Sequence, residues 1–267
     1  MGPRIAGILN VTPDSFSDGG LYDEPGAAIR QAEQLLRDGA DIIDVGGEST
    51  RPGARLVGEA EELRRVLPVV EALAGRCEVS IDTTKESVAR ACVKAGASIV
   101  NDVSAELYAV AADLGAGWIA THKRGTPATM QDNPEYDDVL REVTDYLVVQ
   151  AEKAKAAGVA GVWIDPGLGF GKRPQHDYDL LRGVGELVAT GFPVCVGASR
   201  KSFIGQATGQ TRPERRVSGS VVAAAWAAAA GADLIRVHDV RATLDGLRVA
   251  GAIMGDTWHE HPAHRQP

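Results

Sequence analysis

A three-part unit recurs along this chain and constrains its fold more than any other feature. In each unit a glycine ends an amphipathic segment, a short run rich in β-branched residues follows, and a polar cluster comes directly after that run. The units begin at Gly39, Gly96, Gly115, Gly158 and Gly231. Glycine is favoured where a helix ends in a left-handed conformation, and short, almost continuous apolar runs are typical of buried parallel strands. The repetition predicts an α/β protein whose parallel sheet is covered by helices.

The number of apolar runs predicts one domain, a single (β/α)8 TIM barrel over residues 1–255, with long active-site loops after the first two strands. The expected strands are residues 4–11, 42–45, 78–82, 98–102, 117–122, 162–165, 193–199 and 233–239. Expected helices include 25–38, 59–74, 139–151 and 242–254, and Thr83 or Thr84 is expected to cap the helix after the third strand. The uncharged run 217–232 favours a buried helix, and 256–267 a flexible C-terminal tail.

Charge and cysteine usage limit the possible partners and compartment. A formal net charge of -8 argues against binding nucleic acid or an anionic membrane surface, so an anionic substrate would need a local positive site. The first residues enter a strand without a signal-peptide pattern. Cys77, Cys92 and Cys195 lack the spacing of a metal site or a disulfide framework. Reduced thiols in a cytoplasmic protein are therefore expected.

Three polar side chains follow apolar strands in a way that predicts a ligand. Asp82, Asn101 and Asp165 each end such a strand, and the carboxyl ends of barrel strands form the active face. Buried carboxylates and amides must be hydrogen-bonded. Carboxylates accept hydrogen bonds, and an amide both donates and accepts them. The set therefore suits a flat heterocycle that presents several N–H donors.

Cations at the same end of the barrel predict a second kind of ligand. They are Arg51, Lys201, Arg236 and His238, and Ser202 follows Lys201 at the start of a short helix. Positive charge beside exposed backbone N–H groups binds phosphate or carboxylate. Asp239 is the one orienting partner that the sequence offers His238 as a general base. Neither a Ser/His/Asp spacing nor a covalent nucleophile is apparent.

The loop after the first strand adds a candidate metal ligand. Asn10 precedes an acidic loop that also carries the aromatic Phe16. Mg²⁺ keeps several waters and takes few protein ligands, so one amide with phosphate oxygens could hold it. Together these features predict a barrel enzyme that binds a planar ring and a polyanion with Mg²⁺, and transfer away from a pyrophosphate leaving group would fit.

Seven motifs, in order from Ile8 to Val240, resemble those of the dihydropteroate synthase family. They read ILNVTPDSFSDGG, DVGGESTRPGA, SIDT, NDV, DPGLGFGK, GASRKSFIG and RVHDV. The resemblance implies a pterin-binding barrel, a homodimer, and a step of folate synthesis. In that step 6-hydroxymethyl-7,8-dihydropterin diphosphate and 4-aminobenzoate give 7,8-dihydropteroate and pyrophosphate.

Motif by motif, the resemblance also implies roles for individual residues. Asp82, Asn101, Asp165 and Lys201 would hold the pterin, with catalytic roles for Arg51, Asp82, Asp165 and Lys201. Asn10 would meet Mg²⁺ and the pyrophosphate, and Arg236 and His238 would bind the diphosphate. Thr50, Arg51 and Pro52 would close over the site with Phe16. The aminobenzoate pocket would be formed by Phe16, Pro52, Phe170 and Ser202.

One departure and two alternatives accompany this interpretation. Thr121 stands where many relatives have methionine before the histidine of the fifth strand, which could alter one wall of the pterin pocket. A pterin-binding corrinoid methyltransferase could share the acidic ring-binding set, but it would not need the two loops or the basic motifs. A catalytically inactive paralogue that acts as a binding subunit is the non-enzyme alternative, although its loops would be expected to be degenerate.

Overall fold

The computed structural model describes residues 2–12, 24–49, 56–126, 129–256 and 258, and these form the predicted barrel. Within them, eight parallel strands pair in the order β6-β5-β4-β3-β2-β1-β8-β7. The strands are β1 (Arg4–Asn10), β2 (Ile42–Gly46), β3 (Glu78–Asp82), β4 (Ile99–Asp102), β5 (Gly117–Thr121), β6 (Val162–Asp165), β7 (Cys195–Val196) and β8 (Leu234–Val237). One isolated bridge, Ile164 to Val194, joins β6 to β7, so the barrel is nearly closed.

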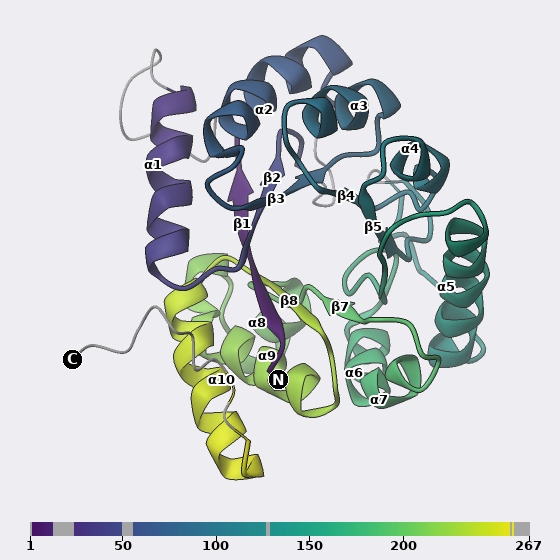
Figure 1. The fold of residues 1–267 in the computed structure, drawn as a ribbon. Helices are drawn as coiled ribbons and strands as arrows, with labels where there is room; N and C mark the ends of the chain where they lie inside the picture. The colour runs from purple at the N-terminus through teal and green to yellow at the C-terminus, as the bar shows by residue number, and fades with distance from the viewer. Residues whose placement is uncertain (1, 13–23, 50–55, 127–128, 257, 259–267) are drawn as a thin grey trace.

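Helices surround the strands as an outer ring (Figure 1). They are α1 (Glu24–Arg37), α2 (Glu59–Leu73), α3 (Glu86–Lys94), α4 (Tyr108–Asp113), α5 (Val139–Ala156), α6 (Pro174–Arg182), α7 (Val184–Val188), α8 (Ser202–Thr208), α9 (Val217–Ala229) and α10 (Val240–Met254). The five glycines that introduce the repeated units all have positive φ angles, between 65° and 120°. The predicted left-handed helix ends are thereby confirmed.

Two local predictions were wrong. Neither Thr83 nor Thr84 caps α3, because the N-cap position belongs to Lys85, and Thr83 instead accepts a hydrogen bond from the Lys85 amide at 3.2 Å. The seventh strand is two residues long rather than seven. Pro193 cannot donate to a ladder, and the chain turns away after Val196 to form the loop before α8.

Side chains of the strands alternate between two apolar layers. The outward ones pack against the helices, whereas a separate cluster fills the barrel interior, here called the lumen. The lumen cluster consists of Ala6, Ile42, Ile99, Ile119, Cys195 and Leu234, with Trp163 packed against it. Two residues further along the same strands, the alternation places polar groups in the lumen at its carboxyl end. These are Asp44, Asn101, Thr121, Asp165 and Arg236.

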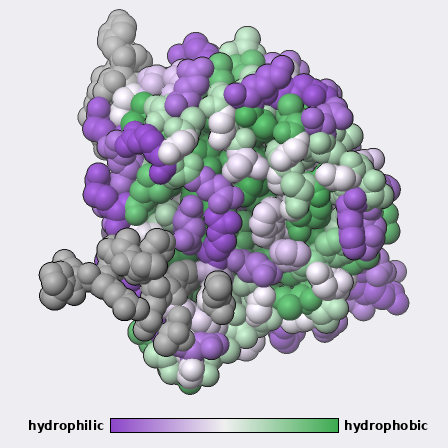
Figure 2. Space-filling view, viewed as in Figure 1, coloured by the Kyte–Doolittle hydropathy of each residue, from purple (hydrophilic) through white to green (hydrophobic). Residues whose placement is uncertain are grey.

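The Ala-rich helix α9 is not fully buried, contrary to the prediction. Its inner face packs, but Val222 and Trp226 are 68% and 58% exposed, and α10, which lies against it, exposes Val249 and Ile253. A low content of charge indicated burial of the whole helix, but only one face contacts the barrel. The face in Figure 2 carries hydrophilic side chains over the outer helices with hydrophobic ones between them. Among the described helices, none has both the length and the apolarity that crossing a bilayer requires.

Candidate active site

Strand register brings three of the predicted site residues to one level of the barrel. Asn10 pairs with Gly46, Gly46 with Asp82, and Asp82 with Asn101, so the carboxyl ends of β1 to β4 are aligned. Because Gly46 lacks a side chain, the space between its neighbours stays open. A Cβ atom there would lie 3.6 Å from Asp82 Cβ and 3.9 Å from Asn10 Oδ1.

A network of charged groups fills the top of the lumen. Arg236 donates from Nε to Asp44 Oδ2 at 2.6 Å and from a terminal nitrogen to Asp82 Oδ2 at 2.7 Å. Asn101 donates its amide to both oxygens of Asp44, at 3.2 and 3.3 Å. The network joins β2, β3, β4 and β8 across the barrel. The carboxylates of Asp44 and Asp82 share the guanidinium of Arg236, so the network has more hydrogen-bond acceptors than donors.

Asp82 provides that surplus acceptor. Its Oδ1 is buried and has no hydrogen-bond partner among the described residues. Burial raises the pKa of Asp82 to about 7, with Asp44 acting in the same direction and Arg236 against it. A buried oxygen without a hydrogen bond costs free energy unless a ligand donates one to it. This oxygen is therefore a candidate acceptor for a ligand N–H group.

Asp165 lies on the opposite wall of the lumen, beside Arg236. Its Oδ1 accepts a hydrogen bond from the amide of Gly167 at 2.7 Å. A Cβ atom on Gly197 would lie 3.9 Å from Asp165 Oδ2 and 3.7 Å from a terminal nitrogen of Arg236. Gly197 thus leaves open the space in which a planar ligand could reach both walls.

Lys201 reaches the same side of the site from the loop after β7. Its ammonium group donates to the carbonyl of Leu168 and lies 4.5 Å from the ring centroid of Phe170. Burial lowers the pKa of Lys201, while Asp165 opposes that shift. A lysine and an aromatic ring held together offer a cation and an apolar wall to one ligand.

The Phe170 loop is held by a buried pair, Lys172 and His122, that the sequence did not reveal. Lys172 is 2% exposed, and its Nζ lies 2.9 Å from His122 Nδ1 and donates to the Phe170 carbonyl at 3.1 Å. Burial lowers the pKa of Lys172 to about 7 and that of His122 to about 3, so the histidine is neutral and accepts. Asp177 accepts from the Gly169 amide at 2.7 Å. The loop is therefore held along most of its length.

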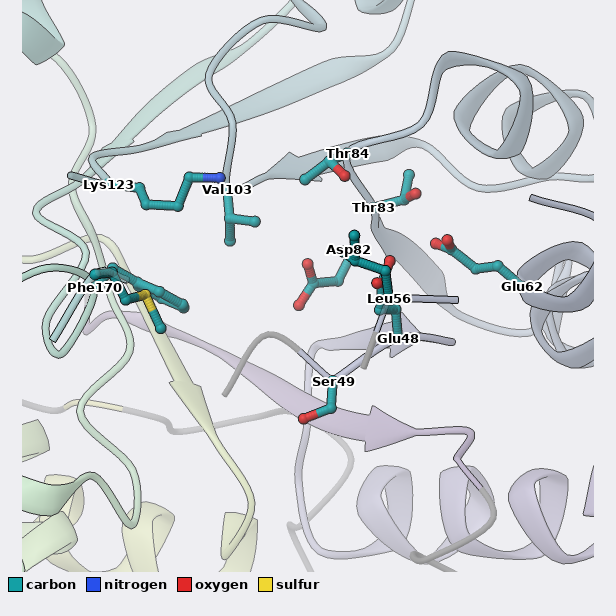
Figure 3. Close-up of a pocket in the computed structure, with 11 residues that line it drawn as sticks. Glu48, Ser49, Leu56, Glu62, Asp82, Thr83, Thr84, Val103, Lys123 and Phe170 are labelled. Carbon is teal, nitrogen blue, oxygen red and sulfur yellow. The ribbon is translucent and has the colours of Figure 1, made fainter. Parts of the chain in front are cut away.

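A pocket opens beside Asp82 and Phe170 (Figure 3). It spans about 590 Å³, including the part open to solvent, and is lined by Glu48, Ser49, Leu56, Glu62, Asp82, Thr83, Thr84, Val103, Lys123, Met130 and Phe170. Figure 3 shows Asp82 between Phe170 on one side and Glu62 on the other. Two of the lining acids, Glu48 and Glu62, form ion pairs with Lys85.

The remaining predicted residues fall into two groups. His238 faces Ser199, whose hydroxyl lies 3.0 Å from its Nδ1, and Asp239 pairs with Arg200 instead, so Asp239 is not the orienting partner that we expected. Ser202 is the exposed first residue of α8. Four predicted positions lie outside the described residues: Phe16, Thr50, Arg51 and Pro52.

Asp44 and Lys172 are two of the site residues that sequence reasoning overlooked. Asp44 lies within β2, two positions after the lumen-facing Ile42, so the alternation of a strand was the available signal. Lys172 ends the glycine-rich PGLGFGK segment, and nothing in that pattern separates a buried lysine from an exposed one.

Comparison with known proteins identifies the family. Residues 6–238 match the family described as pterin binding enzyme. Dihydropteroate synthase of Escherichia coli K12 is 47% identical over 260 residues, which cover 94% of this chain and 92% of that protein. The chain belongs to the dihydropteroate synthase family.

Solved structures of dihydropteroate synthases share its fold. The enzyme of Xanthomonas albilineans with 4-aminobenzoic acid superposes with a TM-score of 0.89 at 46% identity, covering 95% of this chain and 93% of that one. The same enzyme in complex with 7,8-dihydropteroate gives 0.86 at 43% identity over 95% and 94%. The Yersinia pestis dihydropteroate synthase, solved as a sulfonamide drug complex, gives 0.89 at 43% identity over 95% of each chain.

Proposed function

We propose that this protein is a dihydropteroate synthase that condenses 6-hydroxymethyl-7,8-dihydropterin diphosphate with 4-aminobenzoate, releasing pyrophosphate and 7,8-dihydropteroate in folate synthesis. The observation that carries the proposal is the acceptor set at the carboxyl end of the lumen. Asp82, Asn101 and Asp165 lie at or next to the carboxyl ends of β3, β4 and β6. Asp82 lines the same pocket as Phe170, against whose ring the Lys201 ammonium group lies. Relatives at 43–47% identity over almost the full chain perform this reaction by name.

The acidic residues suit the pterin and its chemistry. The open oxygen of Asp82 and the second oxygen of Asp165 can each accept a ring N–H. As the exocyclic C–O bond breaks, its electron pair leaves with the pyrophosphate and positive charge develops on the pterin. Negative groups fixed in a water-poor lumen stabilise that charge. Arg236 already pairs with Asp44 and Asp82, so its assignment to the diphosphate remains a prediction.

The second substrate needs an apolar wall and little base catalysis. The amine of aminobenzoate is neutral, so its lone pair can form the C–N bond directly, and the proton is lost afterwards to water or pyrophosphate. Phe170 offers a ring edge for the aromatic substrate, and Ser202, at the start of α8, is proposed to meet its carboxylate. Phe16, Thr50, Arg51 and Pro52 are proposed to complete the site.

Mg²⁺ is proposed as the cofactor, with Asn10 as its protein ligand. The Asn10 amide oxygen faces the same gap at Gly46 as Asp82 does, and hard oxygen donors suit Mg²⁺. No group of three or more histidine, cysteine, aspartate or glutamate residues that could hold a metal exists among the described residues. The donor set therefore fits an ion that takes most ligands from water and substrate phosphates, and such an ion would neutralise the departing pyrophosphate.

A homodimer in the cytoplasm is also proposed. Val222 and Trp226 of α9 and Val249 and Ile253 of α10 are exposed apolar residues on two helices that contact each other, and a second copy that packs on this helix pair would bury them. The three cysteines are free thiols, as a reducing compartment requires.

Pyrophosphate release tests the proposed function. Purified protein is given the pterin diphosphate and Mg²⁺, with and without 4-aminobenzoate, and the product is separated by chromatography. We expect release that depends on 4-aminobenzoate and yields dihydropteroate, and loss of release when EDTA removes Mg²⁺. Pterin binding without release would favour the methyltransferase or the inactive paralogue, and a corrinoid methyl-transfer assay would separate those two.

A further inference from the structure

One buried charge has no place in the proposed reaction. Asp44 is 1% exposed and faces the lumen from the middle of β2, yet it does not line the pocket. A buried carboxylate is costly unless it is paired and hydrogen-bonded. An apolar residue could fill this part of the barrel interior without the free energy of burying a charge. Packing alone therefore does not explain why the residue is an aspartate.

Its bonds tie together two side chains that are proposed to meet the ligand. Asp44 Oδ2 accepts a hydrogen bond from Arg236 Nε at 2.6 Å and forms an ion pair with a terminal nitrogen of Arg236 at 2.5 Å. It also accepts the amide of Asn101 with both oxygens. The three residues come from the even-numbered strands β2, β4 and β8, which contribute one interior layer of an eight-stranded barrel. Asp44 therefore lies in the same interior layer as the two side chains that it binds.

The amide of Asn101 shows the effect most simply. An asparagine side chain can turn either its oxygen or its NH₂ group toward a ligand. Because Asp44 accepts only, it takes the NH₂ group, and the Asn101 oxygen is directed elsewhere. The acceptor face of Asn101 is thereby fixed by a residue that does not touch the pocket.

Asp82 is affected through the shared guanidinium. Arg236 gives its Nε to Asp44 and one terminal nitrogen to Asp82, which leaves Asp82 Oδ1 without a partner among the described residues. The charged groups that face Asp82 are Arg236 from β8, Asp44 from β2, Glu62 from α2 and Asp102 from β4. Asp44 is the strongest of the three acids that raise its pKa.

We propose that Asp44 is a positioning residue of the pterin site, which orients Asn101 and Arg236 and keeps the open oxygen of Asp82 available to the ligand. The inference rests on the proposed function only in that the ligand is a pterin. Asp44 forms no bond to substrate, and its removal acts through its three neighbours.

Substitution of Asp44 by asparagine tests this role, because it retains the shape and removes the charge. Asp41→Asn is the matched control: Asp41 precedes the same strand at the opposite end of the barrel, where its carboxylate accepts the Ile5 amide at 2.8 Å. The affinity for 6-hydroxymethyl-7,8-dihydropterin is measured by calorimetry between pH 5.5 and 8.5. KM for each substrate and kcat are measured over the same range.

For Asp44→Asn, pterin affinity should fall about tenfold, as expected for one charge-assisted hydrogen bond, and KM for aminobenzoate should stay within about twofold. The acidic limb of the pH profile should move to lower pH, because Asp82 loses a neighbouring like charge that raises its pKa. Asp41→Asn should change neither quantity. A folded Asp44→Asn protein with normal pterin affinity and an unmoved pH profile would overturn the proposal.

A second measurement covers the case in which Asp44→Asn does not fold. In the unmutated protein, the Arg236 Nε–H signal in a ¹⁵N spectrum, assigned by its loss in Arg236→Lys, should exchange slowly with water and stay in place when pterin binds. Fast exchange, as in an exposed arginine, would show that Asp44 does not hold the group. Absence of pyrophosphate release by the unmutated protein would refute the proposed function but not the role of Asp44. That role is tested separately by the pterin calorimetry and by this signal.

Discussion

Two glycines of the PGLGFGK loop should respond very differently to the same substitution. Gly167 and Gly169 have positive φ angles of 64° and 78°, so alanine is strained at both. They differ in what a new methyl group meets. At Gly167 it would lie 1.9 Å from the backbone oxygen of His122, whereas at Gly169 it would lie 3.4 Å from Lys201 Cδ, an ordinary contact.

The difference in free energy follows from these contacts. A left-handed alanine costs about 1–2 kcal/mol at either position. At Gly167 the carbonyl must also move, and it belongs to a residue whose amide donates to the Asp165 carbonyl at 2.9 Å. Forced shifts of this kind add about 1–3 kcal/mol. We therefore expect Gly167→Ala to lose about 2–5 kcal/mol of unfolding free energy and Gly169→Ala about 1–2 kcal/mol.

Denaturant unfolding of both variants measures the two losses, and thermal melts should differ by about 2–4 °C per kcal/mol. Pyrophosphate release should fall more for Gly167→Ala, because His122 and the Phe170 loop move with the displaced strand end. Equal losses of stability in the two variants would refute the argument, since they would mean that the backbone contact is absent and only the strain counts.

Further predictions concern individual side chains. Asp82→Ala and Lys201→Ala should each weaken pterin binding at least about tenfold in calorimetry, since each removes a charged partner, and unchanged affinity would remove that residue from the pocket. Arg51→Ala should lower turnover far more than the melting temperature, and the reverse would show a structural role. Trp226→Arg should turn dimers into monomers in analytical ultracentrifugation, and an unchanged mass would place the interface elsewhere. Lys172 has a pKa of about 7 in the folded protein and near 10.5 in the unfolded chain. Between pH 7 and 10.5 the folded state therefore binds fewer protons than the unfolded state, and the free energy of unfolding increases as the pH rises. Lys172→Met should remove that gain, as unfolding at pH 7 and pH 9.5 would reveal.

The order of the elements could be predicted because each strand carries its own signal. Short apolar runs marked the positions of all eight strands, five of them introduced by a glycine, and helices such as α5 showed a clear stripe of apolar residues. Prediction failed where the outcome depends on distant contacts. The exposed face of α9 is as apolar as its buried face, so the sequence could not distinguish them. The shortness of β7 depends on where the chain leaves the sheet after Val196 to form the loop before α8.

In the candidate site, too, local patterns could be predicted and long-range contacts could not. Residues at strand ends, such as Asp165, were recognisable because a polar group there follows an apolar run. Asp44 was not, because its importance depends on Arg236, a residue 192 positions away. Pairing of Asp239 with Arg200 rather than with His238 depends likewise on how two loops meet.

The weak contact between β6 and β7 has a consequence for dynamics. One bridge joins these strands, while every other neighbouring pair forms a ladder. Amide hydrogens of β7 should therefore exchange with solvent sooner than those of β2 or β3. Asp165 belongs to one side of this gap and Lys201 to the other, so a pterin that binds both links the two edges. With the proposed roles, the substrate would add a link between β6 and β7 to the one that Lys201 makes with the Leu168 carbonyl, and its arrival should slow exchange in β7 more than anywhere else in the sheet.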